Sequence, residues 1–534
     1  MRKAVGILTL IVIIFIGAWS YLASSLGPFW LEGEHLEWGY GIAKTGSIHY
    51  SWNFDINKVW PHDLKYSRSL ILPYLCSLAI NMPGNPLVWC RLVPLFFLLL
   101  TFCIVTFYFY RRGDLSPQRL IIWSVLFFCS SIIIDMSYYL RPYTMLGAAM
   151  SITFILYWEA VAQFRQNDKK KALLFGLLSL LPLGLSVLDQ WQLEGIPAFC
   201  IAVATSILAF NPRFSLLYDW VKRKSGLLLA VTMLMAPIVV QGKLLERITS
   251  LIYIGGFNLT TQFFSNYLDN CMGWLRFILA INVGLLTWRY AFTSKTPMTF
   301  YRWIFINGIL TGIFNILYLP FAPVYFPMYA YLPILMVVIG LSGMMEDVFI
   351  NRSLLKRMVV IYVLINLPIA AINVLELNNA KKAIHWLSGH LAQDDILLIF
   401  AENTNLYFCG EGKLLPRTHN IDASTDKKHI MDLIKFISSH PHGRIFYFYK
   451  NDAASRAWLY RAVIGKDMDP PLDLQSYLRI QIPATTMIPG LRNCGLLEFD
   501  RPVLLNSLED LLRQGYGPKP HYGSRDFIHH LMKT

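Results

Sequence analysis

The chain has 534 residues, of which 55% are hydrophobic and only 15% are charged. This composition is too apolar for an ordinary soluble protein and indicates a polytopic α-helical membrane protein. The formal net charge is +14, but the lysines and arginines occur in short clusters between apolar segments. Such clusters are typical of cytoplasmic loops, so we predict membrane lipids as partners and no nucleic acid.

The first apolar segment follows Arg2 and Lys3 and continues to about Leu26. It is long and lacks a clear small-residue cleavage site, so we interpret it as a retained membrane helix with a cytoplasmic N-terminus. A span needs about 20 mostly apolar residues, and on this measure the sequence predicts about eleven. They cover residues 4–26, 86–110, 118–137, 142–163, 172–189, 195–211, 226–242, 271–290, 301–320, 327–345 and 357–375.

The basic clusters all fall on one side when these spans are threaded from a cytoplasmic start, as the positive-inside rule requires. The opposite, outer side then receives a loop of residues 27–85, in which the apolar run Leu70–Met82 is expected to lie along the interface. The chain therefore divides into a transmembrane domain, residues 1–375, and a C-terminal domain, residues 376–534.

Residues 376–534 differ from the rest, because short strand-like runs alternate with helix-like pieces. This alternation predicts an extracytoplasmic α/β domain, since an odd number of spans places the segment outside. The strand-like runs are Ile396–Phe400, Arg444–Tyr449 and Gly495–Phe499, and the helix-like pieces are Ala380–Leu391, Asp426–Ser439 and Ala453–Ile464.

Carboxylates gather near the outer ends of the predicted spans, which favours a polar cavity on that face. Glu32 and Glu34 stand just after the first span, and Asp189, Gln192 and Glu194 surround one short turn. The simpler interpretation is that these groups only solvate helix ends. Two carboxylates are too few ligands for a metal ion, so we predict neither a metal nor a cofactor.

Two arginines lie at the same depth. Arg91 is a few residues inside the second span, and Arg141 opens the fourth in Tyr138-Tyr139-Leu140-Arg141-Pro142-Tyr143. A guanidinium at headgroup depth is suited to a lipid phosphate, which its planar fork binds bidentately. The alternative is that each side chain extends to ordinary phospholipid headgroups.

The order of these motifs resembles the GT-C class of integral-membrane glycosyltransferases, near the protein O-mannosyltransferase and aminoarabinose-transferase branch. The resemblance rests on an acidic motif after the first span, Ala43-Lys44-Thr45-Gly46, Arg91-Leu92, the Arg141-Pro142-Tyr143 motif and a tyrosine-rich late span around Tyr329. Two departures are Leu31-Glu32-Gly33-Glu34, where such enzymes have Asp-Glu, and Met328-Tyr329, where Arg-Tyr is common.

The resemblance implies transfer of a sugar from a polyprenyl-phosphate donor to a hydroxyl of a lipid, glycan or protein acceptor on the outer face, in a bacterial inner membrane. Glu32, or Glu34 as the alternative, is the expected general base, and Arg91 and Arg141 are expected to hold the donor phosphate. Tyr143, Asp189, Gln192, Glu194 and Tyr329 are expected to line the substrate cavity. Two other functions stay open: a lipid-linked sugar flippase or transporter, and a non-catalytic subunit of an envelope glycan assembly complex.

Overall fold

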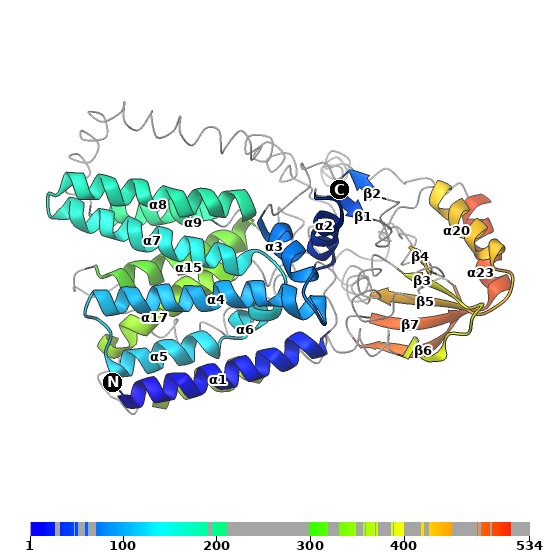
Figure 1. The fold of residues 1–534 in the computed structure, drawn as a ribbon, viewed down its shortest axis with the longest axis horizontal. Coiled ribbons are helices and arrows are strands. Elements are labelled where there is room, and N and C mark those ends of the chain that lie inside the picture. Colours follow the sequence, from blue (N-terminus) through cyan, green and yellow to red (C-terminus); the bar gives the residue numbers. More distant parts are fainter. Residues whose placement is uncertain are drawn as a thin grey trace, which may run out of the picture.

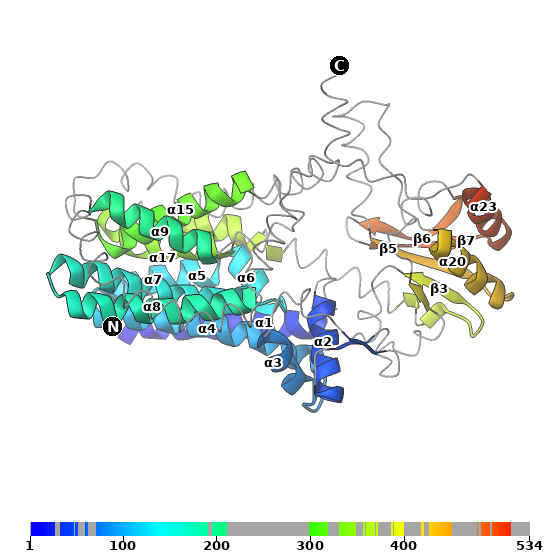
Figure 2. The ribbon, with the colours of Figure 1, turned by 90° about the horizontal axis from the view of Figure 1, so that it is seen from above.

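The chain folds into a long helical bundle followed by a five-stranded sheet (Figure 1). The computed structural model describes residues 2–26, 32–46, 49–51, 59–61, 71–190, 195–210, 298–318, 331–348, 356–357, 359–368, 370–371, 386–387, 389–399, 418–420, 427–450, 478, 482–491 and 494–513. The helices of the bundle run along one long axis, and the sheet lies beyond one end of the bundle, next to α2 and α3 (Figure 2).

The bundle contains helices from both halves of the chain. Its members are α1 (Arg2–Ser25), α4 (Pro86–Arg111), α5 (Pro117–Phe128), α6 (Ser131–Tyr138), α7 (Tyr143–Arg165), α8 (Lys169–Gln190), α9 (Gly195–Ala209), α15 (Phe300–Tyr318) and α17 (Tyr331–Val348). Their starts follow from local chemistry at two places, where Asn85 and Ser116 cap the first turns of α4 and α5 and a proline occupies the first helical position. Aromatic rings fill the centre, with Phe102 stacked on Trp123 at 5.3 Å between ring centroids.

Within the described residues, α1, α4 and α7 are long and apolar enough to cross a membrane. The exposed side chains of α1 are largely apolar, among them Leu10, Ile13 and Ile14, as expected for a surface that faces lipid. The chain is thus a helical membrane protein, while the predicted number of spans is not tested by the residues described.

The predicted span over residues 118–137 is not one straight helix but a bent pair of helices. The chain bends by 62° between α5 and α6, and this pair counts as a fourth candidate span only if both helices are taken together. The bend has a specific partner, because the backbone N–H and the hydroxyl of Ser131 both donate to Asn366 Oδ1, each at 3.1 Å. A side chain from far along the sequence thus satisfies a backbone donor at the break that a continuous helix would satisfy itself.

The segment 27–85, predicted as an outer loop, contains helices and strands among its described residues. It contains α2 (Glu32–Thr45), the antiparallel pair β1 (His49–Ser51) and β2 (Val59–Pro61), and α3 (Ile71–Ile80). Pro73 does not break the apolar run, because it falls in the first turn of α3, where no intrahelical N–H bond is lost. The two helices pack together, so they form a folded cap on one end of the bundle.

The sheet has the strand order β4-β3-β5-β7-β6, with parallel pairs β4/β3 and β3/β5 and antiparallel pairs β5/β7 and β7/β6. Its strands are β3 (Ile396–Ile399), β4 (Thr418–Asn420), β5 (Ile445–Lys450), β6 (Ala484–Leu491) and β7 (Cys494–Phe499). The predicted strand-like runs coincide with β3, β5 and β7. Helices α20 (Lys427–Ser439) and α23 (Arg501–Arg513) bury leucines and isoleucines at three- and four-residue spacing against the sheet.

Candidate functional site

The candidate site lies at the end of the bundle that α2 and α3 cover. The buried residues of α2 include Glu32, His35, Leu36, Gly39 and Ile42, a spacing of three and four that places them on one helix face. A Cβ added at Gly39 would stand 2.8 Å from Cys76 Cβ of α3. The absence of a side chain at Gly39 therefore lets the two helices approach, which fixes the direction in which Glu32 and His35 point.

Glu32 is the first residue of α2 and is fully buried. Arg91 of α4 binds it with both arms of its fork: Nε donates to Oε1 at 3.3 Å and Nη2 donates to Oε2 at 2.8 Å. The backbone N–H of Leu140 adds a third donor to Oε1 at 2.7 Å. The sequence predicts these groups on one face, and the structure brings Glu32 and Arg91 into direct contact.

Arg91 also joins the end of α1 to this pair. Its Nη1 donates to the carbonyl oxygens of Ala23 at 3.0 Å and Leu26 at 2.8 Å. Both members of the ion pair have a side-chain exposure of 0%. A buried pair of this kind needs all of these hydrogen bonds to offset the loss of water, so Arg91 fixes α1, α2 and α4 relative to one another.

Arg141 lies in the short segment between α6 and α7, one residue after Leu140, whose N–H binds Glu32. Its Nη1 lies 3.1 Å from Nε2 of His35, and both residues are buried. A guanidinium can only donate, so a hydrogen bond between these two atoms requires Nε2 of His35 to be the accepting nitrogen. Trp38 packs edge-on against the His35 ring at 5.3 Å between centroids.

His35 was missed in the sequence analysis. The available signal was its spacing: it lies three residues after Glu32 and four before Gly39, on the face that a helix would bury. Interpreting residues 27–85 as a loop concealed that spacing. The contact with Arg141 could not be read from the sequence, because 106 residues separate the two side chains.

The remaining predicted site residues are placed less fully. Tyr143 is buried at the start of α7, beside Arg141 in sequence. Glu34 and Asp189 have backbones within α2 and α8, but their side chains lie outside the described part of the structure. Gln192, Glu194 and Tyr329 also lie outside the described residues. The roles given to all these residues, as to Glu32, Arg91 and Arg141, stay predictions.

Comparisons with known proteins give one kind of match. No protein-family profile and no curated protein matches the sequence. Among solved structures, ArnT from Cupriavidus metallidurans in the apo state matches with a TM-score of 0.51 and 12% identity, over 94% of this chain and 99% of that one. The same protein bound to undecaprenyl phosphate matches with a TM-score of 0.52 and 11% identity, over 92% and 98%. The chain therefore has the fold of ArnT along nearly its whole length, as the resemblance stated above predicted.

Proposed function

We propose that this protein is a membrane glycosyltransferase, which moves a sugar from a polyprenyl-phosphate donor to a hydroxyl acceptor on the outer face of the membrane. The observation that carries the proposal is the buried cluster of Glu32, Arg91, His35 and Arg141 at one end of a bundle with this fold. One of the matching ArnT structures is bound to undecaprenyl phosphate, which is a lipid of the proposed donor class.

In the proposed reaction, an oxygen of the acceptor hydroxyl attacks the anomeric carbon. The bond from that carbon to the phosphate oxygen breaks, and its electron pair stays on the lipid phosphate. A glutamate takes the hydroxyl proton, and the single displacement inverts the anomeric centre. The leaving phosphate gains negative charge, which a guanidinium stabilises, and Arg141 is our candidate for this role.

The contacts of Glu32 distinguish the two candidate bases. Both carboxylate oxygens of Glu32 already accept hydrogen bonds, two from the guanidinium of Arg91 and one from the backbone N–H of Leu140. Glu32 can take the proton only if Arg91 withdraws from it. Otherwise Glu32 and Arg91 position the start of α2, and Glu34, two residues further along the helix, becomes the base. Arg91 is then a positioning residue rather than a phosphate ligand.

The test is turnover by the purified full-length protein in nanodiscs, supplied with a panel of polyprenyl-phosphate sugars. Glu32→Gln and Glu34→Gln are compared, with Glu37→Gln of the same helix as the matched control. The variant that lacks the base should lose about 10²- to 10⁴-fold in turnover and keep donor binding, because glutamine preserves shape but takes no proton.

Four results would each give a different answer. Full turnover in both Glu32→Gln and Glu34→Gln would overturn the mechanism. A lower melting temperature with retained turnover in Glu32→Gln, together with lost turnover in Glu34→Gln, would assign Glu32 to positioning and Glu34 as the base. Movement of the intact lipid-linked sugar between leaflets without transfer would favour the flippase, and neither activity would favour the non-catalytic subunit.

A further inference from the structure

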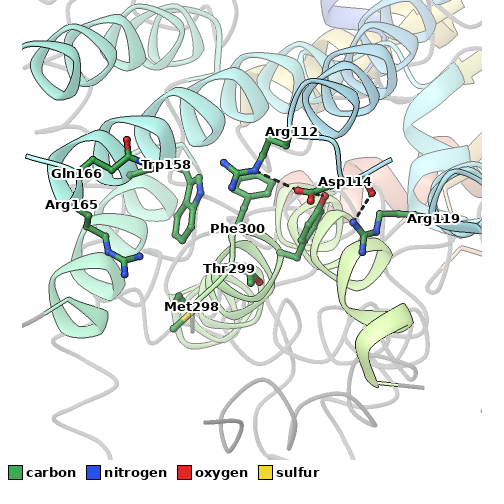
Figure 3. Close-up of a pocket in the computed structure, with 11 residues that line it drawn as sticks. Arg112, Asp114, Arg119, Trp158, Arg165, Gln166, Met298, Thr299 and Phe300 are labelled. Carbon is green, nitrogen blue, oxygen red and sulfur yellow. Dashed lines mark hydrogen bonds and ion pairs between the residues drawn. The ribbon is translucent and has the colours of Figure 1, made fainter. Parts of the chain in front are cut away.

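A second polar site lies at the opposite end of the bundle from Glu32. Here α4 and α7 end, α5 and α15 begin, and the four ends enclose a cavity of about 710 Å³ (Figure 3). This volume is within the range of small-molecule sites, roughly 300–1,000 Å³. None of the residues placed in the proposed glycosyl transfer lines it.

Positive charge predominates in the lining. Arg112, Arg119 and Arg165 face the cavity from three different helix ends, and among the described residues Asp114 is the one acidic residue that lines it. Arg112 contacts Asp114 at 3.4 Å. It also contacts Glu159, which is not a lining residue, at 2.9 Å. Among the residues that the structure describes here, three guanidinium groups stand against these two carboxylates.

The arginines are held in place by neutral groups as well. Arg119 donates to the backbone carbonyl oxygens of Asp114 at 2.6 Å and Gly343 at 3.4 Å, and its guanidinium carbon lies 5.0 Å from the centre of the Tyr301 ring. The guanidinium of Arg165 stands over Phe210 at 4.4 Å. These contacts orient the side chains, so each planar guanidinium is pre-organised for an anion.

The start of α15 borders the same cavity. Thr299 caps this 19-residue helix: its hydroxyl accepts from the N–H of Arg302 at 3.3 Å, and its carbonyl accepts from the N–H of Trp303 at 2.9 Å. Phe300 and Tyr301, the first two residues of the helix, line the cavity. The positive end of the helix dipole is therefore directed at the same space as the arginines.

We propose that this cavity binds the negatively charged phosphate group of a ligand. It lies at the ends of α4 and α7, two helices that are long enough to span a membrane, so its depth is that of lipid headgroups. Trp158, Phe300 and Tyr301 give it aromatic walls, which suit a phosphate that carries an organic group. The same chemistry is available from an anionic phospholipid and from a soluble phosphate, and the experiment separates these two sources.

The experiment uses the full-length protein in nanodiscs of phosphatidylcholine, with and without phosphatidylglycerol, and counts retained lipids by native mass spectrometry. Arg119→Gln and Arg165→Gln should each reduce the retention of phosphatidylglycerol about tenfold, the size of one charge-assisted contact. Arg111→Gln is the matched control, because Arg111 is exposed at the same helix end and does not line the cavity. Equal loss in Arg111→Gln would show surface attraction only and overturn the site.

A measurement on the unmodified protein covers the case in which a variant fails to fold. Phenylglyoxal modifies accessible arginines, and a bound phosphate should protect Arg119 and Arg165 while Arg111 stays reactive. Protection by phosphatidylglycerol assigns a lipid headgroup. Protection by inorganic phosphate in phosphatidylcholine discs assigns a soluble anion. No protection by either would overturn the proposal.

Discussion

Two ion pairs, one in the helical bundle and one in the sheet, have similar geometry and different surroundings. In each, an arginine directs Nε and Nη2 at a carboxylate from a distant part of the chain: Arg91 at Glu32, and Arg444 at Asp395. The Glu32 and Arg91 side chains have an exposure of 0%, whereas the Arg444 side chain is 44% exposed and Asp395 only 2%. Similar hydrogen bonds are thus formed at a site closed to solvent, around Arg91, and at a solvent-exposed site, around Arg444.

This comparison indicates what each pair contributes. Water can replace Asp395 around Arg444, so breaking that pair leaves a solvated charge. Water cannot reach Arg91 or Glu32, so breaking this pair leaves a buried and uncompensated charge. The Glu32–Arg91 pair is therefore required for the arrangement of α1, α2 and α4. The Asp395–Arg444 pair only moderately stabilises the contact between the turn before β3 and the start of β5.

The largest expected effect is that of Arg91→Met, which keeps the length of the side chain and removes the charge. It should destabilise the protein by about 3–5 kcal/mol, because Glu32 stays buried without its partner. Thermal unfolding of the purified protein in detergent, followed by tryptophan fluorescence, measures the change.

The double variant Glu32→Gln/Arg91→Met tests the cause. It removes both charges and should recover much of the lost stability. If the double variant is as unstable as Arg91→Met alone, the hydrogen bonds from Arg91 to the carbonyls of Ala23 and Leu26 matter more than the charge of Glu32.

The sequence predicted much of this end of the molecule, and the limits of the prediction have physical reasons. Glu32, Arg91 and Arg141 were identified because charged residues near apolar spans are expensive and therefore few. Their pairing could not be predicted, since 59 residues separate Glu32 from Arg91 and only the packing of α2 on the bundle brings them together. The lipid-phosphate role predicted for Arg91 rests on its depth and on the family resemblance, and neither of these reveals its protein partner Glu32.

In the fold, too, features set by neighbouring residues can be predicted from the sequence, whereas features set by distant residues cannot. Strands β3, β5 and β7 were predicted, because their apolar runs are bounded by turn residues. The bend between α5 and α6 was not, because no proline marks residues 118–137, and the side chain that bonds at the break comes from Asn366.

A moderate effect is expected at Asp395. Burial raises the pKa of this carboxyl, but hydrogen bonds from the Arg444 side chain and from the backbone N–H groups of Arg444 and Ala392 outweigh burial and hold the pKa below its ordinary value of 3.8. A depressed pKa means that the carboxylate stabilises the folded state above about pH 4, and that this stability is lost as the pH falls through the folded pKa. Asp395→Asn should cost about 1–3 kcal/mol near neutral pH and remove this part of the acid sensitivity.

Amide hydrogen exchange in β3 and β5, corrected for the intrinsic effect of pH on exchange, measures this change locally. Between about pH 5 and about pH 3, the unmodified protein should lose protection more steeply than Asp395→Asn. Asp432→Asn, at an exposed position on α20, is the matched control and should behave as the unmodified protein does. Identical pH profiles for all three proteins would show that the Asp395 carboxylate does not set the acid sensitivity of the sheet.

The smallest effect is expected for a third ion pair, Arg112–Glu159, at the end of the bundle opposite Glu32. Arg112 contacts Glu159 at 2.9 Å, as close as the bundle and sheet pairs, but the two side chains are 38% and 24% exposed. Water and salt screen such a pair, so Arg112→Gln should change stability by no more than about 1 kcal/mol and should matter less as salt is added. The measurement is the same thermal unfolding as for Arg91→Met, at low and high salt. If Arg112→Gln destabilises as much as Arg91→Met and salt has no influence, then exposure does not determine what these ion pairs contribute. The packing of the arginine side chains would have to explain both losses instead.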